Sequence, residues 1–178
     1  MRSLKFIFTI IILQTLSVFA VSAQSSIPNG CLGVDFGSSP AKVKEIMAKK
    51  SGYPKDYSKD ENQLLVYTPI SFAGNPCHNI NFAFVNKKMF MVWIKLKIEY
   101  YGEYNTFNKV YKELCEKYGE TKIDYTASGN SIETVAKWKD EKNVISLVLS
   151  NAGLSLNYYN ILLSKEAMKA SENSKNEY

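Results

Sequence analysis

INFAFVNKKMFMVWIKLKI, residues 80–98, alternates apolar with other side chains on both sides of a polar break at Asn86-Lys87-Lys88. Alternation with a period of two is the pattern of a half-buried β-strand, and a short polar break between two such runs is typical of a hairpin. We therefore predict an antiparallel hairpin whose second strand directs one set of side chains toward a core: Phe90, Val92, Ile94, Leu96 and Ile98.

The opposite face of that second strand carries Met89, Met91 and Trp93, followed by Lys95 and Lys97. Large apolar side chains on a second sheet face need a cover, which is either a helix, loop or tail of the same chain or a partner. Methionine adapts its shape and tryptophan offers a large contact area, while lysines favour an acidic partner. These five residues are the candidate partner-binding surface.

Two amphipathic helices are predicted on either side of the hairpin. The first runs over residues 39–50, with Ser39 as N-cap and Pro40 at the first helical position. The second runs over residues 105–118, where apolar side chains recur at spacings of three and four, and Gly119 ends it. Further strands are expected at residues 64–67, 133–139, 144–150 and 154–162.

The order helix and three strands thus occurs twice, which predicts an α+β fold. We expect an antiparallel sheet of about six strands with both helices on one face, built from a duplicated αβββ unit. The single domain would span residues 36–163, with half-repeats at about 36–101 and 104–163. Residues 24–35 are predicted to be a polar lead, and residues 164–178 a polar tail that frays.

Residues 1–23 are typical of a cleavable secretory signal peptide. Arg2 and Lys5 precede an apolar stretch, and Val21-Ser22-Ala23 supplies small residues for cleavage. The apolar run is too short and too polar for a membrane anchor, which needs roughly 20 apolar residues. Lipid attachment at Cys31 is the alternative, but its preceding residues are a poor lipoprotein signal. We expect an exported protein, periplasmic or secreted, without a membrane span after cleavage.

Composition narrows the classes of partner. The chain of 178 residues contains ample apolar and aromatic side chains for a core, at 46% and 13%. Arg2 is its only arginine, so the mature chain lacks the guanidinium groups that dominate specific recognition of phosphates and guanine edges. Specific nucleic-acid binding is therefore not expected, and the partner class that remains is an envelope or secreted protein.

The three cysteines behind the signal peptide are Cys31, Cys77 and Cys115. Cys115 falls on the apolar stripe of the second helix and is expected to be a buried thiol. Cys31 and Cys77 lie in loop-like surroundings, so a disulfide between them is possible in an exported protein, although unpaired thiols are equally compatible with the sequence.

Several short motifs suggest catalysis, but each has a simpler explanation. Ser39 and Lys42 form an S-x-x-K, and Ser128-Gly129-Asn130 stands in place of S-D-N, yet the third motif of serine β-lactamases is missing. Cys77 and His78 are neighbours, and in extended backbone they point to opposite sides. The carboxylates Glu99 and Glu103 have no evident counterpart across a cleft. We predict no catalytic residue, no metal site and no cofactor.

A family resemblance rests on short segments: Val34-Asp35-Phe36-Gly37-Ser38, Phe72-Ala73-Gly74, Phe84 to Met89, Glu116 to Gly119, and Trp138 before Ile145-Ser146-Leu147. In these the chain resembles small exported bacterial proteins whose helix-plus-three-strands units are similar to those of β-lactamase inhibitory protein and of the small lipoprotein of the outer-membrane assembly machine. The resemblance implies binding or assembly. The expected function is an exported, non-catalytic binding or inhibitor-like module; the alternative is a small extracytoplasmic hydrolase without a recognisable motif.

Overall fold

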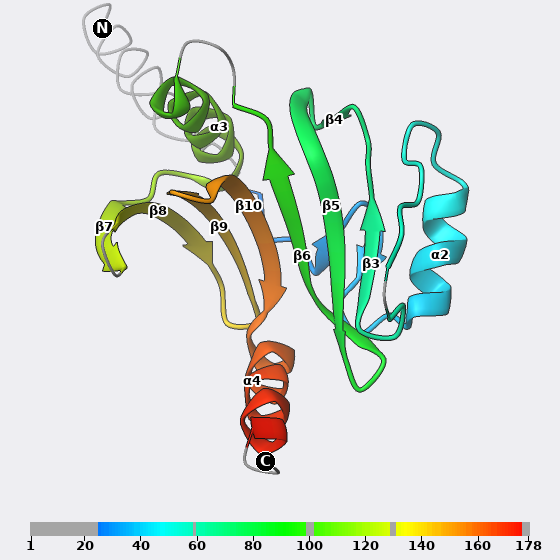
Figure 1. The fold of residues 1–178 in the computed structure, drawn as a ribbon. Coiled ribbons are helices and arrows are strands. Elements are labelled where there is room, and N and C mark those ends of the chain that lie inside the picture. The colour runs from blue at the N-terminus through cyan, green and yellow to red at the C-terminus, as the bar shows by residue number, and fades with distance from the viewer. Residues whose placement is uncertain (1–24, 59, 99–101, 129–130, 176–178) are drawn as a thin grey trace, which may run out of the picture.

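The computed structural model describes residues 25–58, 60–98, 102–128 and 131–175 (Figure 1). The signal peptide predicted at residues 1–23 lies outside the described residues. The strands are β1 (Gly30–Cys31), β2 (Val34–Asp35), β3 (Leu64–Tyr67), β4 (Ser71–Phe72), β5 (Asn75–Val85), β6 (Lys88–Leu96), β7 (Ile123–Ser128), β8 (Ser131–Lys139), β9 (Asn143–Ser150) and β10 (Gly153–Asn160). The helices are α2 (Pro40–Ala48), α3 (Glu103–Tyr118) and α4 (Ile161–Lys175). None of these described helices combines the length and apolar character needed to cross a bilayer.

An antiparallel sheet of eight strands forms the centre of the molecule, with the order β3-β5-β6-β10-β9-β8-β7 and β4 paired to the start of β5. The α+β class is confirmed, but the expected count of about six strands is too low. The sequence interpretation missed β7, although Ile123, Tyr125 and Ala127 alternate with polar side chains there, and it missed β4, which has only two residues. The last strands of the two halves, β6 and β10, are hydrogen-bonded to each other in the middle of the sheet.

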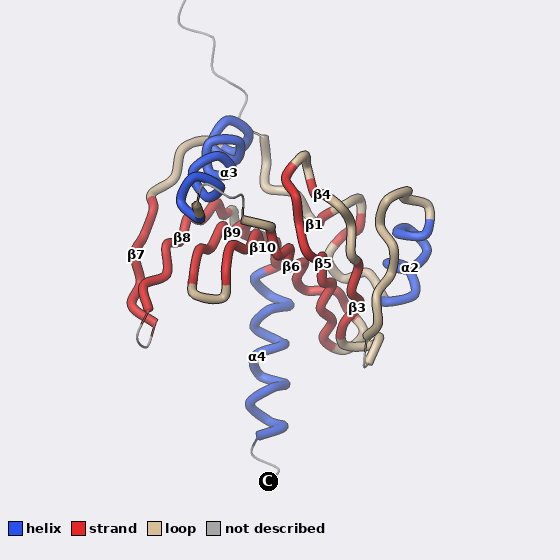
Figure 2. Tube along the Cα trace, turned by 45° about the horizontal axis from the view of Figure 1, so that its top comes forward, coloured by secondary structure: helices blue, strands red, loops and turns tan. Residues whose placement is uncertain are grey.

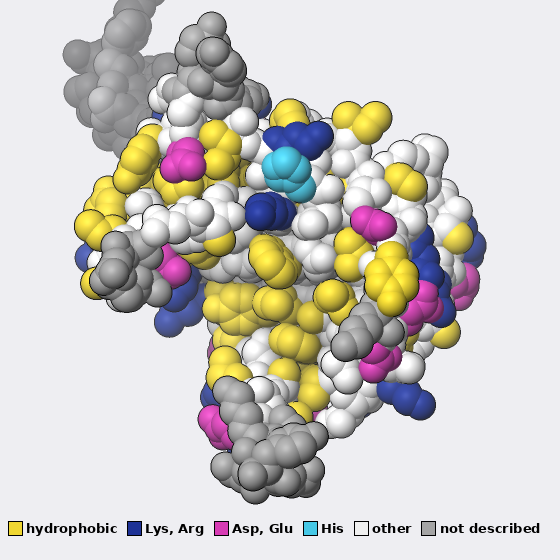
Figure 3. Space-filling view, in the orientation of Figure 1, with side chains coloured by type: hydrophobic (Ala, Val, Ile, Leu, Met, Phe, Trp, Pro, Cys, Tyr) yellow, Lys and Arg dark blue, Asp and Glu magenta, His cyan; other side chains and the backbone are white. Residues whose placement is uncertain are grey.

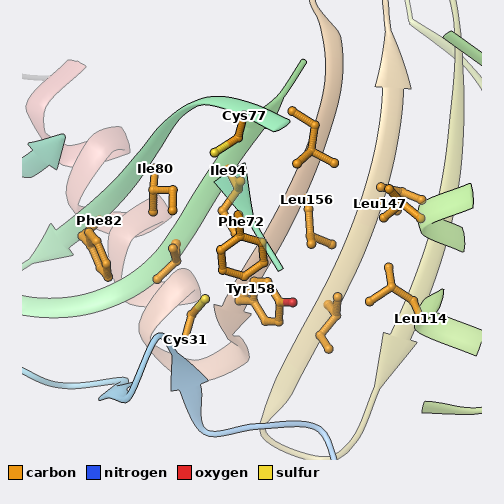
Figure 4. Close-up of a cluster of buried hydrophobic side chains, with 14 of the residues drawn as sticks. Cys31, Phe72, Cys77, Ile80, Phe82, Ile94, Leu114, Leu147, Leu156 and Tyr158 are labelled. Atoms are coloured by element: carbon orange, nitrogen blue, oxygen red, sulfur yellow. The ribbon is translucent and has the colours of Figure 1, made fainter. Parts of the chain in front are cut away.

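One face of the sheet carries the hydrophobic core (Figure 4). Strands β5, β6 and β10 contribute alternate buried side chains to it, among them Phe82, Ile94 and Leu156. Helix α2 adds Val43 and Met47, and α3 adds residues such as Phe107 and Leu114, to the same cluster. Both predicted helices therefore cover one face.

Helix boundaries follow the capping residues closely. The Ser39 hydroxyl oxygen accepts a hydrogen bond from the backbone N–H of Lys42 at 3.2 Å, and Pro40 occupies the first turn of α2. This hydroxyl satisfies one of the amides that a helix start leaves unpaired. At the end of α3, Gly119 has a φ of 85° and donates its N–H to the Cys115 carbonyl at 2.8 Å. The predicted N-cap and stop signals are thus confirmed.

The expected polar lead at residues 24–35 is wrong, because these residues contain the β1–β2 hairpin. Cys31 and Val34 are buried and belong to the core. The hairpin turns at Leu32 and Gly33, which both have positive φ, as a tight type I′ connection requires. Leucine rarely adopts a positive φ, so nothing at Leu32 indicated a turn in the sequence. Glycine is required at Gly30, where a Cβ would lie 1.9 Å from the Val34 carbonyl oxygen.

The expected polar tail at residues 164–178 is also wrong over its described part, which forms helix α4. The strand predicted for residues 154–162 ends at Asn160, and α4 begins directly at Ile161. The Asn160 side-chain oxygen accepts from the Leu163 N–H at 3.1 Å, so it caps the helix start. The helix contacts β5, β6 and β10 and extends beyond the ends of these strands (Figures 1 and 2).

All three cysteines are free, so of the two possibilities for Cys31 and Cys77, a disulfide or unpaired thiols, the structure has the unpaired thiols. Both are buried, Cys31 in β1 and Cys77 in β5, and Figure 4 draws Phe72 and Ile94 between the two sulfur atoms. Their loop-like surroundings misled the prediction, since both in fact lie on strands that enter the core from different layers. Cys115 is half-buried rather than buried.

Candidate interaction face

The sheet face opposite the core, here called the outer face, is only partly covered (Figure 3). Three rows of side chains cross it from strand to strand. The middle row contains, in order, Lys137, Ser146, Asn157, Trp93, Asn81 and Val66. Hydrophobic side chains gather on the part of this face next to α4 in Figure 3, with lysine and histidine side chains above them. The outer face is therefore polar at one end and apolar at the other.

A β-bulge changes which residues of β6 reach the outer face. Ala83 pairs with Met91 and Phe84 pairs with Met89, so Phe90 is an extra residue on β6 without a direct partner. One extra residue reverses the alternation on one side of a bulge. Met89 is accordingly turned into the core, where none of its side-chain surface is exposed. The predicted cluster is corrected: Met91 and Trp93 share the outer face, but Met89 does not.

The same bulge explains a second difference from the sequence interpretation. Phe90 was expected to face the core with Val92 and Ile94, but it lines the outer groove together with Met91. A strict period of two cannot anticipate this displacement. The prediction for Val92, Ile94 and Leu96 is confirmed, since all three are buried in the core.

Trp93 lies near the middle of the outer face, and 43% of its surface is exposed. Its neighbours in the row are Asn157 on β10 and Asn81 on β5. The Asn81 amide donates to the Trp93 carbonyl oxygen at 3.2 Å and to the Asn79 side-chain oxygen at 2.9 Å. The Asn157 amide donates to the Ser146 hydroxyl at 3.3 Å. These bonds hold the polar groups beside Trp93 in fixed positions.

A groove of about 590 Å³ lies beside this row, between the outer face and α4. Phe90, Met91 and Tyr159 line it from the sheet, and Ala167 and Met168 line it from the helix. Met168 is 64% exposed. Methionine and aromatic side chains that line an open groove are typical of surfaces that accommodate apolar groups of a partner. Sequence reasoning missed the contribution of α4; the spacing of Ala167 and Met168 from Leu163 was its one available signal.

Four lysines lie on or directly beside this face, while Asp124 and Glu133 share its β7–β8 end and Glu172 lines the groove. Lys95 is half-buried in β6 beside Ser155, and Lys97 is exposed directly after β6. Lys137 and Lys139, both exposed, lie on the outer face of β8, in the rows of Trp93 and Met91. The predicted lysines thus belong to a larger basic rim, which favours acidic groups.

The catalytic motifs are not brought together as a reaction would need. The Lys42 ammonium forms an ion pair with the Glu45 carboxylate at 2.9 Å and does not approach the Ser39 hydroxyl. That hydroxyl caps the start of α2. Cys77 is buried on the core side, whereas His78 is exposed. Ser128 lies on β7, Gly129 and Asn130 lie outside the described residues, and Glu99 does too. Within the described ranges, no group of three or more His, Cys, Asp or Glu side chains is arranged to hold a metal ion.

Burial also makes the Cys31 thiol unreactive. Its removal from water raises the pKa of Cys31 to about 12, although a backbone hydrogen bond at Leu32 opposes the shift. A thiol is nucleophilic only as its thiolate, so Cys31 is a packing residue at neutral pH.

Residues 33–170 match the family model of the TP0088 domain, and the chain therefore belongs to that family. The match includes the whole main sheet and α4 as far as Ala170, so Trp93 and most of the groove lie inside it. No curated protein and no solved structure matches the chain. The resemblance to β-lactamase inhibitory protein and to the assembly lipoprotein thus receives no support from these comparisons.

Proposed function

We propose that this member of the TP0088 domain family is an exported, non-catalytic binding module that holds a partner protein on its outer face. The observation that carries the proposal is the exposed Trp93 beside the groove under α4. Tryptophan and methionine on an open surface are the residues that most often anchor protein partners. The neighbours of Trp93 in the row, Asn157 and Asn81, are short polar side chains, and Asn157 is the more exposed of the two.

The chemistry of the face indicates the kind of segment it takes. The groove fits one or two apolar side chains, since its walls are Phe90, Met91 and Tyr159 on one side and Met168 on the other. Lys95 and Lys97 lie on the far side of Trp93 from the groove. The partner segment therefore presents an apolar anchor next to acidic residues, and its association is expected to weaken as salt concentration rises.

We also propose that the two halves of the domain descend from one duplicated unit. Each half is a helix followed by antiparallel strands, α2 with β3, β5 and β6, and α3 with β8, β9 and β10. The strand order of the second half is the reverse of the first, and the halves meet where Trp93 of β6 pairs with Asn157 of β10. The candidate anchor thus lies at the junction of the two units.

Export of the protein is part of the proposal and rests on the signal-like residues 1–23. The alternative of lipid attachment requires Cys31 to be an accessible N-terminal residue. In the folded chain Cys31 is buried within β1, and the backbone before it is fixed by the hydrogen bond from the Ser25 N–H to the Lys117 carbonyl at 3.0 Å. These contacts support cleavage after Ala23, which makes Gln24 the first residue of a soluble mature chain, and the intact mass of the native protein tests this.

Photo-crosslinking in the native host tests the binding face. A photoreactive residue placed at Trp93 should capture one defined protein, whereas the same residue at Tyr104 should not. Tyr104 is an equally suitable exposed aromatic position, on α3 and away from the outer face. With the captured protein purified, Trp93→Ala should weaken binding at least tenfold and Tyr104→Ala should leave it unchanged.

The fold has to survive these substitutions for the test to count. Trp93→Ala should lower the free energy of unfolding by no more than about 1 kcal/mol, because its side chain is half in solvent. A loss of ~3 kcal/mol or more would show that Trp93 is a core residue and would contradict the proposed face. Equal crosslinking at both positions, or turnover of the captured protein, would contradict a specific non-catalytic site.

A further inference from the structure

The two edge strands of the main sheet differ in how far their backbone N–H and C=O groups are covered. At the β3 edge, the loop before the strand supplies partners: the Asp56 N–H donates to the Val66 carbonyl at 2.8 Å, and the Thr68 N–H donates to the Pro54 carbonyl at 2.9 Å. The Val66 N–H also donates to the Ser58 hydroxyl at 3.2 Å. This loop therefore covers the backbone groups that an edge strand would otherwise expose.

The opposite edge, β7, has no such cover among the residues that the structure describes. It lies at the border of the molecule in both ribbon views (Figures 1 and 2) and pairs only with β8. Its six residues, Ile-Asp-Tyr-Thr-Ala-Ser, include no lysine, no proline and no bulge, and Asp124 is their one charge, so the strand has few of the devices that natural edge strands use against pairing. Every second residue of such a strand directs its N–H and C=O away from the sheet.

The side chains around this edge are also apolar on one face. Tyr125 pairs with Thr134, and Ala127 pairs with Ile132, so all four lie on the face that carries the core elsewhere in the sheet. Helix α3 covers β9 and β10, and the end of the β7–β8 hairpin extends past it (Figure 2). Tyr125 is 70% exposed and Ile132 is 69% exposed. The apolar side chains of the core side of the sheet thus extend to β7, where they are exposed to solvent.

We propose that β7 is a self-association edge, where two copies of this chain pair antiparallel about a two-fold axis at Tyr125 and form one continuous sheet. An antiparallel edge is complementary to itself in hydrogen bonding, because each copy offers the same alternation of donors and acceptors. Ser128 pairs with Ser131 next to the turn of the β7–β8 hairpin. In this register the backbone N–H and C=O groups of Ile123, Tyr125 and Ala127 point away from β8.

Charge and packing favour a second copy over another partner at this edge. In the Tyr125-centred register, Ile123 faces Ala127 of the second copy, and Asp124, the only charge on the strand, faces Thr126. No like charges meet. The two Tyr125 rings come together, with Ile132 of each copy behind them on the same face, so each copy buries the other's exposed apolar side chains. Aromatic pairs directly across antiparallel strands are stabilising.

The proposal does not depend on the groove, because β9 and β8 separate β7 from β10, the nearest strand that lines the groove. Five paired residues of each strand and a small apolar patch bury less than the ~1,600 Å² of a standard interface, so we expect a weak, concentration-dependent dimer. This predicts a monomer at low concentration and a dimer as the concentration approaches the millimolar range.

Sedimentation of the purified protein over that concentration range tests the proposal. Wild type should approach twice the monomer mass, and Tyr125→Lys should remain monomeric, because two like charges then face each other. Tyr57→Lys is the matched control, since Tyr57 is an exposed tyrosine in the loop that covers the β3 edge. It should behave as wild type. Circular dichroism checks that each variant keeps its sheet.

A charge-pair experiment tests the symmetry and the register. Tyr125→Lys and Tyr125→Glu should each be monomeric alone, and their equimolar mixture should regain dimerisation. A wild-type protein that stays monomeric throughout would overturn the proposal, as would a dimer that Tyr125→Lys does not weaken by at least tenfold. Protection of the β7 amides by an added partner protein, in a wild type that never dimerises, would show that the edge takes a different chain.

Discussion

The core face and the outer face of the main sheet share the same strands but bury very different side chains. On the core face, Phe82, Ile94 and Leu156 are closed off under α2, α3 and the β1–β2 hairpin. One residue along, Asn81 and Asn157 flank Trp93 on the outer face, where α4 covers only one end. The comparison teaches that the fold needs only one apolar layer, and that the apolar residues of the second layer are available for another role.

The largest expected effect comes from the core face. Phe82 is fully buried and packs edge-on against the ring of Tyr67, with centroids 5.7 Å apart. Phe82→Ala should lower the free energy of unfolding by about 3–5 kcal/mol, because it removes buried apolar surface and leaves a cavity. Chemical denaturation measures this loss. A loss below ~1 kcal/mol would mean that the two faces do not differ in the way described.

The two methionines of β6 give a sharper contrast within one strand. Met89→Ala should destabilise the protein by about 2–5 kcal/mol, since Met89 is fully buried beyond the bulge. Met91→Ala should cost about 1 kcal/mol or less, because Met91 lines the open groove. Both variants are compared by their denaturation midpoints. Equal losses would show that the bulge at Phe90 does not separate the two side chains.

The effect that is smallest at neutral pH is a pH dependence that comes from the core face. Burial raises the pKa of Cys31 to about 12 from an ordinary value of 9.0. The unfolded thiol therefore ionises above about pH 9 while the folded thiol keeps its proton, and stability falls as the pH rises from 9 toward 12. The contribution of Cys31 to that slope is at most ~1.4 kcal/mol per pH unit.

Cys31→Ala should flatten the alkaline slope relative to wild type, whatever its effect on stability at pH 7. Tyr158 contributes in the same direction, since burial raises its pKa too, so a residual slope should persist. Denaturation curves between pH 8 and pH 11 measure the difference. An unchanged slope would place Cys31 in contact with water.

Local signals in the sequence were sufficient for most of the sheet and for two helices. The caps at Ser39 and Gly119 predicted the beginning of α2 and the end of α3 because each depends on a few neighbouring residues. The alternation around Asn86 and Lys87 predicted the β5–β6 hairpin, whose turn has positive φ at both residues. These features are determined by chemistry within a few residues of the chain.

What the sequence could not show depends on contacts between distant segments. The bulge at Phe90 arises from pairing with β5, and it alone decides that Met89 leaves the outer face. Helix α4 has a weak apolar stripe, and its packing on β6 gives it a place that its polar composition did not suggest. Of the predicted binding residues, Met91, Trp93 and the two lysines could be placed on one surface, whereas the groove beside them could not.

The position of β10 between β6 and β9 has a consequence for how the chain reaches its folded state. Lys95 pairs with Ser155, sixty residues further along, so the first half of the sheet ends in an open strand until nearly the whole chain has left the ribosome. Pairings of such long sequence separation form slowly. A chain emerging from its N-terminus therefore leaves β6 without its second neighbouring strand until β10 has been made.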